Sequence, residues 1–154
     1  YPKLEEIALE HGLTHEEKNK KWVMPEEIRI KRAQDVIKAL PHLQGGAKLT
    51  SHLTDVSPKF IILAAIDGGN HIFMNIAKEV EGEATIDLDA LTGVIEEYSD
   101  SLLTDIYIGR RKGFLDELDE EIATLSNENP KFKSGNIKET VENFKTIIPE
   151  LMEP

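Results

Sequence analysis

The residues best suited to chemistry in this sequence are cations that stand beside glycines or at the ends of expected strands. Gly45 and Gly46 precede Lys48, and His52 follows four residues later. Paired glycines let a backbone approach a ligand closely, and a lysine beside them can meet a phosphate. The same residues also fit a plain flexible connector, and the sequence leaves both interpretations open.

A second group of cations follows the apolar run of residues 106–108. Arg110, Arg111 and Lys112 come directly after Gly109, and Phe114 stands two residues further on. Consecutive cations at a strand end, beside an aromatic side chain, suit backbone contact and base stacking with single-stranded nucleic acid. A solvated strand end is the alternative interpretation, and the residues alone do not exclude it.

No motif of a catalytic or metal site stands out in the sequence. Cysteine is absent, and the five histidines are His11, His15, His42, His52 and His71. They form no pattern of zinc ligands. The carboxylates of residues 116–121 are interleaved with leucine and isoleucine, which is typical of the solvated face of a helix rather than of a catalytic pair. Nucleophile-elbow, Walker and dinucleotide-binding motifs are also missing, so we expect no enzyme, no cofactor and no metal site.

Charge is distributed unevenly along the 154 residues. The chain carries 18 basic and 29 acidic residues, a net charge of −11. Such an excess of acid argues against a nucleic-acid surface, because contacts to phosphates supply most of that affinity. Residues 20–60, however, contain eight basic and four acidic residues and therefore net +4. The acidic average hides a basic region.

The composition is that of an ordinary globular domain. Hydrophobic residues make up 40% of the chain and charged residues 31%, which differs from the composition of disordered chains. The longest apolar run, residues 60–66, is much shorter than the roughly 20 apolar residues of a membrane helix. We therefore expect no membrane association. The absence of cysteine fits a reducing compartment, and we expect a cytoplasmic location.

Hydrophobic spacing predicts an α/β (α+β) chain with three or four strands. Strands are predicted at residues 59–66 and 105–109, with a further extended segment at 71–80. Helices are predicted at residues 4–12, 26–40, 87–98, 115–125 and 137–148, together with a short charged helix after the capping-box pair Thr14 and Glu17. The predicted helix at residues 26–40 has an expected apolar face of Ile28, Ala33, Val36, Ile37 and Leu40. The predicted helix at 137–148 has one of Ile137, Val141, Phe144 and Ile148.

The order of these elements divides the chain into two parts. Residues 1–44 form a helical region, and residues 45–154 form a sheet-bearing region with amphipathic helices; the two parts are also compatible with one domain. The predicted strands at 59–66 and 105–109 look central but have few expected partners. We therefore expect a sheet with an open edge, which invites pairing with another chain.

Three short segments have a pattern known from one family. They are LPHLQGGAK at residues 40–48, DVSPKFIILAA at 55–65 and YIGRRKGFL at 107–115. These segments resemble the CRISPR-associated autoregulator DevR family, whose members form the repeated backbone subunit of type I RNA-guided surveillance complexes. The resemblance covers about residues 40–118. It implies part of a modified RNA-recognition-motif (ferredoxin-like) core with added helices, from the C-terminal portion of such a subunit.

The resemblance also implies a non-catalytic function in antiviral defence. Its expected partners are guide RNA, copies of the chain itself and other subunits of the effector complex. We expect RNA contacts from Gly45, Gly46, Lys48, His52, Arg110 and Arg111. The chain departs from the family in being shorter and more acidic, and no aromatic-rich strand is present. A small acidic protein–protein adaptor or regulatory domain, without nucleic-acid binding, is the alternative.

Overall fold

The computed structural model describes residues 2–16, 20–43 and 56–152, which form a mixed α/β fold as predicted. The elements in chain order are α1 (Pro2–Glu10), β1 (Thr14–Glu16), β2 (Lys21–Val23), α2 (Glu26–Ala39), the 3₁₀ turn η1 (Leu40–His42), β3 (Phe60–Leu63), β4 (Ala77–Val80), β5 (Glu83–Ile86), α3 (Leu88–Glu97), β6 (Ile106–Arg110), the 3₁₀ turn η2 (Asp116–Leu118), α4 (Asp119–Glu128), β7 (Phe132–Gly135) and α5 (Ile137–Met152).

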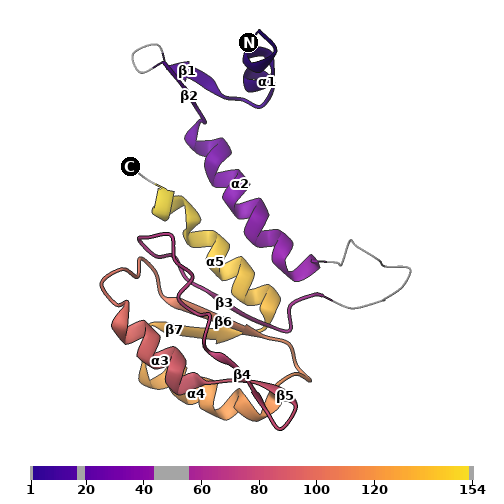
Figure 1. Ribbon diagram of the computed structural model, residues 1–154, viewed down its shortest axis with the longest axis vertical. Coiled ribbons are helices and arrows are strands. Elements are labelled where there is room, and N and C mark those ends of the chain that lie inside the picture. The colour runs from indigo at the N-terminus through magenta and orange to yellow at the C-terminus, as the bar shows by residue number, and fades with distance from the viewer. Residues whose placement is uncertain (1, 17–19, 44–55, 153–154) are drawn as a thin grey trace, which may run out of the picture.

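A three-stranded sheet of order β3-β6-β7 forms the centre of the fold. Strand β3 runs antiparallel to β6, with Phe60 opposite Arg110. Strand β7 runs parallel to β6, with Gly135 opposite Gly109. Helix α5 covers one face of this sheet, and helices α3 and α4 cover the other (Figure 1). Two separate hairpins, β1–β2 and β4–β5, lie outside the sheet.

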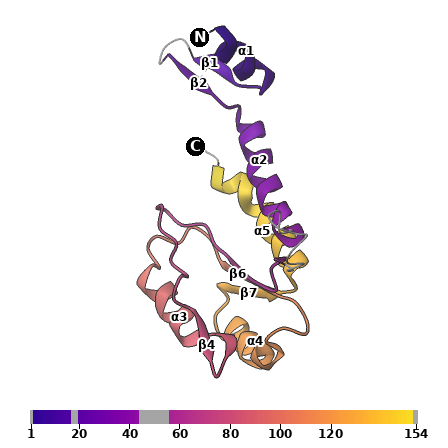
Figure 2. The ribbon, with the colours of Figure 1, turned by 45° about the vertical axis from the view of Figure 1, so that its right-hand side comes forward.

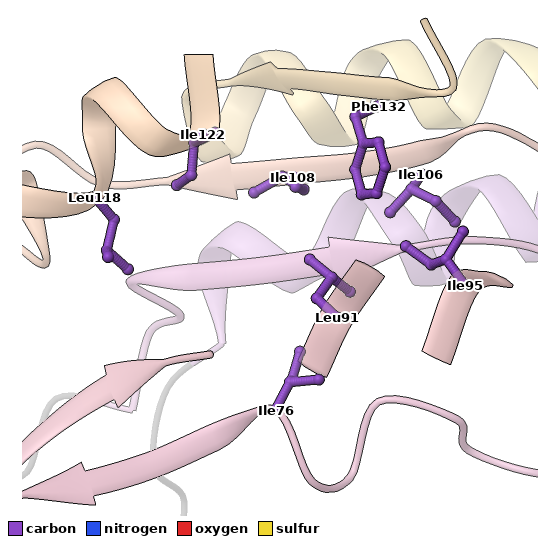
Figure 3. Close-up of a cluster of buried hydrophobic side chains, with 8 residues drawn as sticks. All are labelled: Ile76, Leu91, Ile95, Ile106, Ile108, Leu118, Ile122 and Phe132. Atoms are coloured by element: carbon purple, nitrogen blue, oxygen red, sulfur yellow. The ribbon is translucent and has the colours of Figure 1, made fainter. Parts of the chain in front are cut away.

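The hydrophobic core lies between the sheet and helices α3 and α4. Side chains alternate between the two faces of a strand, so Ile106 and Ile108 of β6 point to the same side and meet Phe132 of β7 there. Leu91 and Ile95 of α3 approach from the opposite side (Figure 3). Asp87 begins α3 as predicted, because its Oδ1 accepts a hydrogen bond from the Ala90 N–H at 2.8 Å.

The opposite face of the sheet is packed against α5. The predicted stripe of Ile137, Val141, Phe144 and Ile148 is confirmed, since all four are buried. Thr140 donates from Oγ1 to the Ile108 carbonyl at 3.1 Å, which brings the helix very close to β6. A Cβ atom on Gly109 would lie 2.8 Å from Ile61 Cγ1 and 3.0 Å from Thr140 Cβ. Glycine at position 109 is therefore what lets α5 approach the sheet so closely.

Helix α2 packs antiparallel along α5, far from α3 and α4 (Figures 1 and 2). Pro149 lies inside α5 and has no N–H, so the Lys145 carbonyl lacks its ordinary helical donor. The Gln34 side chain of α2 donates to that carbonyl at 3.2 Å. Arg29 donates to the Met152 carbonyl at 2.8 Å, at the end of α5 where a cation is favoured by the helix dipole. Side chains of α2 thus donate hydrogen bonds to two carbonyls of α5 that have no donor within that helix.

The expected secondary structure and packing are wrong in several details, and strands β5 and β7 were not predicted. Thr14 starts the β1–β2 hairpin instead of a short helix, with Thr14 opposite Val23 and the rings of His15 and Trp22 5.1 Å apart across the strands. The extended segment at 71–80 is a strand only over Ala77–Val80. Val36 of α2 is 66% exposed and not on the packed face, because α2 turns Gln34 toward α5.

Strand β3 is an edge strand of the sheet in the part of the chain that the structure describes. The Arg111 N–H donates to the Lys59 carbonyl at 2.8 Å, so in an antiparallel ladder the backbone groups of Phe60 and Ile62 point away from β6. An uncharged edge with open backbone groups favours pairing with another strand. We expect sedimentation velocity to show an associating species that grows with protein concentration. A strict monomer across the accessible concentration range would contradict an available edge.

Candidate nucleic-acid interface

Cations gather at one end of the central sheet because of its strand directions. Strand β3 is antiparallel to β6, so the start of β3 lies beside the end of β6. Strand β7 is parallel to β6, so its end lies there too, followed directly by the start of α5. This end of the sheet carries Lys59, Arg110, Arg111, Lys112 and Lys138. Residues distant in sequence thus form one basic end.

A pocket of about 300 Å³ lies at this end, between η1, the turn after β6 and the start of α5. We call it the basic pocket. Its lining residues are Pro41, His42, Arg110, Arg111, Lys112, Asn136, Ile137 and Lys138. Four of these eight residues are arginine or lysine and none is acidic, but Arg110 is paired with Asp116 and Asp119, which leaves Arg111, Lys112 and Lys138 as the other three cations of the lining. The basic pocket therefore has the charge that an anionic group requires.

The start of α5 contributes to the same pocket. Asn136 begins the helix, since its Oδ1 accepts a hydrogen bond from the Glu139 N–H at 3.0 Å. The dipole of the 16-residue helix α5 adds positive potential at this end. Glu139 partly opposes it, because its carboxylate accepts a hydrogen bond from the Asn136 side-chain amide at 3.1 Å. The arginine and lysine side chains therefore supply most of the positive charge.

Arg110 holds the turn after β6 together. Its side chain is only 10% exposed and pairs with both Asp116 and Asp119. It also donates to the Phe114 carbonyl at 2.7 Å. Asp116 in turn accepts the Gly113 N–H at 2.8 Å. Because these contacts link both ends of the turn, the structure places Arg110 where it fixes the shape of residues 111–119.

The ionisation of this cluster favours the same arrangement. Burial lowers the pKa of Arg110, but its hydrogen bonds to Asp116 and Asp119 outweigh burial and leave the pKa above its ordinary value. The Gly113 N–H, and then the Arg110 guanidinium, hold the pKa of Asp116 below the ordinary 3.8. Both groups are therefore charged at neutral pH. The stability that Asp116 contributes is lost only as the pH falls through its lowered pKa.

Arg111 has a different position from Arg110. Side chains of neighbouring strand residues point to opposite faces, and Arg111 is exposed whereas Arg110 is largely covered. The Arg111 side chain donates to Ser57 Oγ at 3.2 Å. Its backbone N–H pairs with Lys59, whose Nζ lies 5.9 Å from the centre of the Phe114 ring. Arg111, Lys59 and Phe114 thus form one continuous surface.

Four of the six predicted RNA-binding residues lie outside the described residues. These are Gly45, Gly46, Lys48 and His52. Of the described residues near the ends of that segment, His42 lines the basic pocket and Ser57 accepts a hydrogen bond from the Arg111 side chain. Of the two predicted residues that the structure describes, Arg110 is paired with Asp116 and Asp119, and Arg111 is exposed. The RNA contacts themselves stay predictions.

Sequence reasoning missed His42 and Lys138 as members of the site. Each stands alone in the sequence, and only the packing of η1 and α5 against the end of the sheet brings them together. A cation at the second position of a helix gives no signal by itself, because such residues are ordinary on helix surfaces. Lys112 belonged to the run of cations noted in the sequence but was not among the six predicted RNA-binding residues.

Two further features were not found among the described ranges. No group of three or more histidine, aspartate or glutamate side chains there is arranged to hold a metal ion. None of the helices described is both long and apolar enough to span a membrane.

The fold and the basic pocket define a mixed α/β chain that presents cations at one end of a small sheet. No protein-family model, curated protein or solved structure matches the chain.

Proposed function

We propose that this chain is a non-catalytic, guide-RNA-binding scaffold subunit of a CRISPR effector complex in antiviral defence. The observation that supports the proposal is the basic pocket, whose lining joins Arg111 and Lys112 of one segment to Lys138 of another and includes no acid. The resemblance of residues 40–48, 55–65 and 107–115 to the DevR family points to the same function. Residues from the first and last of these segments line the basic pocket.

The chemistry of the basic pocket suits RNA phosphates better than base edges. Arginine and lysine side chains donate hydrogen bonds and carry full positive charges, which phosphate oxygens accept in any sequence context. A scaffold that holds different guide sequences needs this kind of contact. In this proposal Arg111, Lys112 and Lys138 contact phosphates, and Arg110 positions the turn that carries two of them.

The proposed ferredoxin-like core is a further part of the proposal. The three-stranded sheet with helices packed against it suits part of such a core. One feature differs: a split βαβ unit has another strand between its two parallel strands, whereas β6 and β7 are direct neighbours. The core proposed here therefore rests on the sequence resemblance more than on strand order.

The alternative function is a small acidic adaptor that binds proteins only. It is favoured by the net charge of −11 and by exposed apolar side chains on α1 and the β1–β2 hairpin, where Ile7 is 48% and Leu9 64% exposed. These elements extend from α2, away from the sheet (Figure 1). An adaptor of this kind has no need of RNA.

RNA binding by the wild-type chain separates the two functions. We expect a fluorescently labelled single-stranded RNA of about 20 nucleotides to bind at low salt, with fluorescence anisotropy as the measurement. Each phosphate contact contributes about −0.7 to the slope of log K against log salt, so three contacts predict a slope of about −2. Absence of binding at low salt would contradict the RNA-binding function and leave the adaptor.

A further inference from the structure

A second pocket, lined by aromatic side chains, lies on the other side of the turn after β6. It has a volume of about 430 Å³ and lies between β3, the β4–β5 hairpin and the turn. We call it the aromatic pocket. Phe60, Phe73 and Phe114 line it together with Ile62 and Ile86. A largely apolar cavity of 300–1,000 Å³ with a few polar groups is typical of sites for small organic groups.

The turn between Arg110 and Leu115 separates the two pockets and belongs to both. Arg111 and Lys112 line the basic pocket, whereas Phe114 and Leu115 line the aromatic pocket. The backbone of Phe114 is held at both its polar groups: its N–H donates to the Arg111 carbonyl at 3.2 Å, and its carbonyl accepts from Arg110. A single fixed turn therefore presents cations to one side and an aromatic ring to the other.

We propose that the aromatic pocket receives one base of a single-stranded RNA whose phosphates lie in the basic pocket. This proposal rests on the RNA-binding function above and adds a second kind of contact to it. Any base can stack on a phenylalanine ring, because every base has a π face, so the contact tolerates all sequences. Lys59, whose Nζ lies 5.9 Å from the centre of the Phe114 ring, adds a cation to the lining of the aromatic pocket.

Charge around the aromatic pocket fixes the direction from which RNA enters. Glu81 and Glu83 of the β4–β5 hairpin are exposed and line a separate hollow together with Glu117. These carboxylates repel a phosphate backbone. Lys59 lines the aromatic pocket and is joined by a backbone hydrogen bond to Arg111, which lines the basic pocket. The phosphates on either side of the inserted base therefore follow the cations, and only the base passes toward the hairpin.

Binding to two chains of equal charge tests this proposal. The first probe is a 12-nucleotide uridine RNA, and the second is a phosphodiester chain of the same length built from abasic units. We expect wild-type protein to bind the RNA more tightly than the abasic chain. Phe114→Ala should weaken RNA binding by about 5- to 150-fold, as alanine substitution of a stacking residue does. It should leave the affinity for the abasic chain and the salt slope unchanged.

Phe114→Tyr is the matched variant, because it keeps the ring and should keep the preference for RNA. Thermal unfolding of both variants shows whether the turn stays folded. Equal binding of RNA and abasic chain by the wild type would overturn the aromatic pocket as a base site while the phosphate-binding function stands. A Phe114→Ala loss that affects both probes equally would also overturn it. If neither probe binds at low salt, both proposals fail.

Discussion

Phe132→Ala is expected to lower the free energy of unfolding by about 3–5 kcal/mol, as large-to-small substitutions of buried aromatic residues do. Phe132 is 1% exposed and lies in the core between the sheet and helices α3 and α4, next to Ile106 (Figure 3). Its removal leaves a cavity that the parallel β6–β7 ladder does not allow to collapse. Urea denaturation followed by circular dichroism measures the loss.

Met74→Ala is the control for that substitution. Met74 is 73% exposed, so its truncation should change the free energy of unfolding by no more than about 0.5 kcal/mol. A loss of about 3–5 kcal/mol in Phe132→Ala and almost none in Met74→Ala would support the core as the structure places it. A Phe132→Ala protein as stable as the wild type would mean that β7 does not pack where the structure places it.

The second large effect concerns the three exposed cations of the basic pocket. Alanine at Arg111, Lys112 and Lys138 together should reduce the magnitude of the salt slope for RNA binding by about 2, because three phosphate contacts are lost. If affinity at 1 M salt is unchanged, this slope difference amounts to a loss of about 400-fold at 50 mM salt. A salt titration by fluorescence anisotropy measures both quantities.

A second triple variant controls for net charge. Alanine at Lys31, Lys131 and Lys133 removes the same number of positive charges from exposed positions outside the basic pocket. We expect its salt slope to stay close to that of the wild type. Equal losses in the two triple variants would show that only overall charge matters and would remove the basic pocket from the account. Arg110 is left unchanged in both variants, because its loss would also disturb the turn.

Helices with a strong apolar stripe or a clear cap were predictable from the sequence. The stripe of α5 repeats at helical spacing and has a buried sheet to cover, so local preference and tertiary packing agree. Asp87 precedes the apolar positions of α3 and caps that helix as its sequence position indicates. Strand β6 was predictable for the same reason, since Ile106 and Ile108 alternate with residues of the opposite face.

Elements with competing local signals were not predictable. Thr14 and Glu17 form a capping-box pattern, but pairing of Thr14 and His15 with Val23 and Trp22 gives a hairpin instead. Strand β7 was missed because Phe132 is its one large apolar residue, followed by Lys133, Ser134 and Gly135. Its extended form depends on the hydrogen-bond ladder with β6, which no local pattern in these four residues reveals.

The candidate site was predictable in part. The run of cations after β6 was visible in the sequence, but the sequence prediction gave Arg110 and Arg111 the same function. The period-2 alternation of a strand distinguishes them: Arg110 follows Ile106 and Ile108 on the face toward α4, where Asp116 and Asp119 meet it. Lys138 was not predictable, because its place beside Arg111 and Lys112 depends on the packing of α5.

The most direct test of RNA binding at the basic end of the sheet is an NMR titration of the chain with a single-stranded uridine oligonucleotide. The account predicts that backbone amide shifts concentrate at Arg111, Lys112, Gly113 and Lys138, and that they fade as salt is raised. The same spectra report on Gly45, Gly46, Lys48 and His52. Shifts confined to α3 and α4, or no shifts at low salt, would contradict the account.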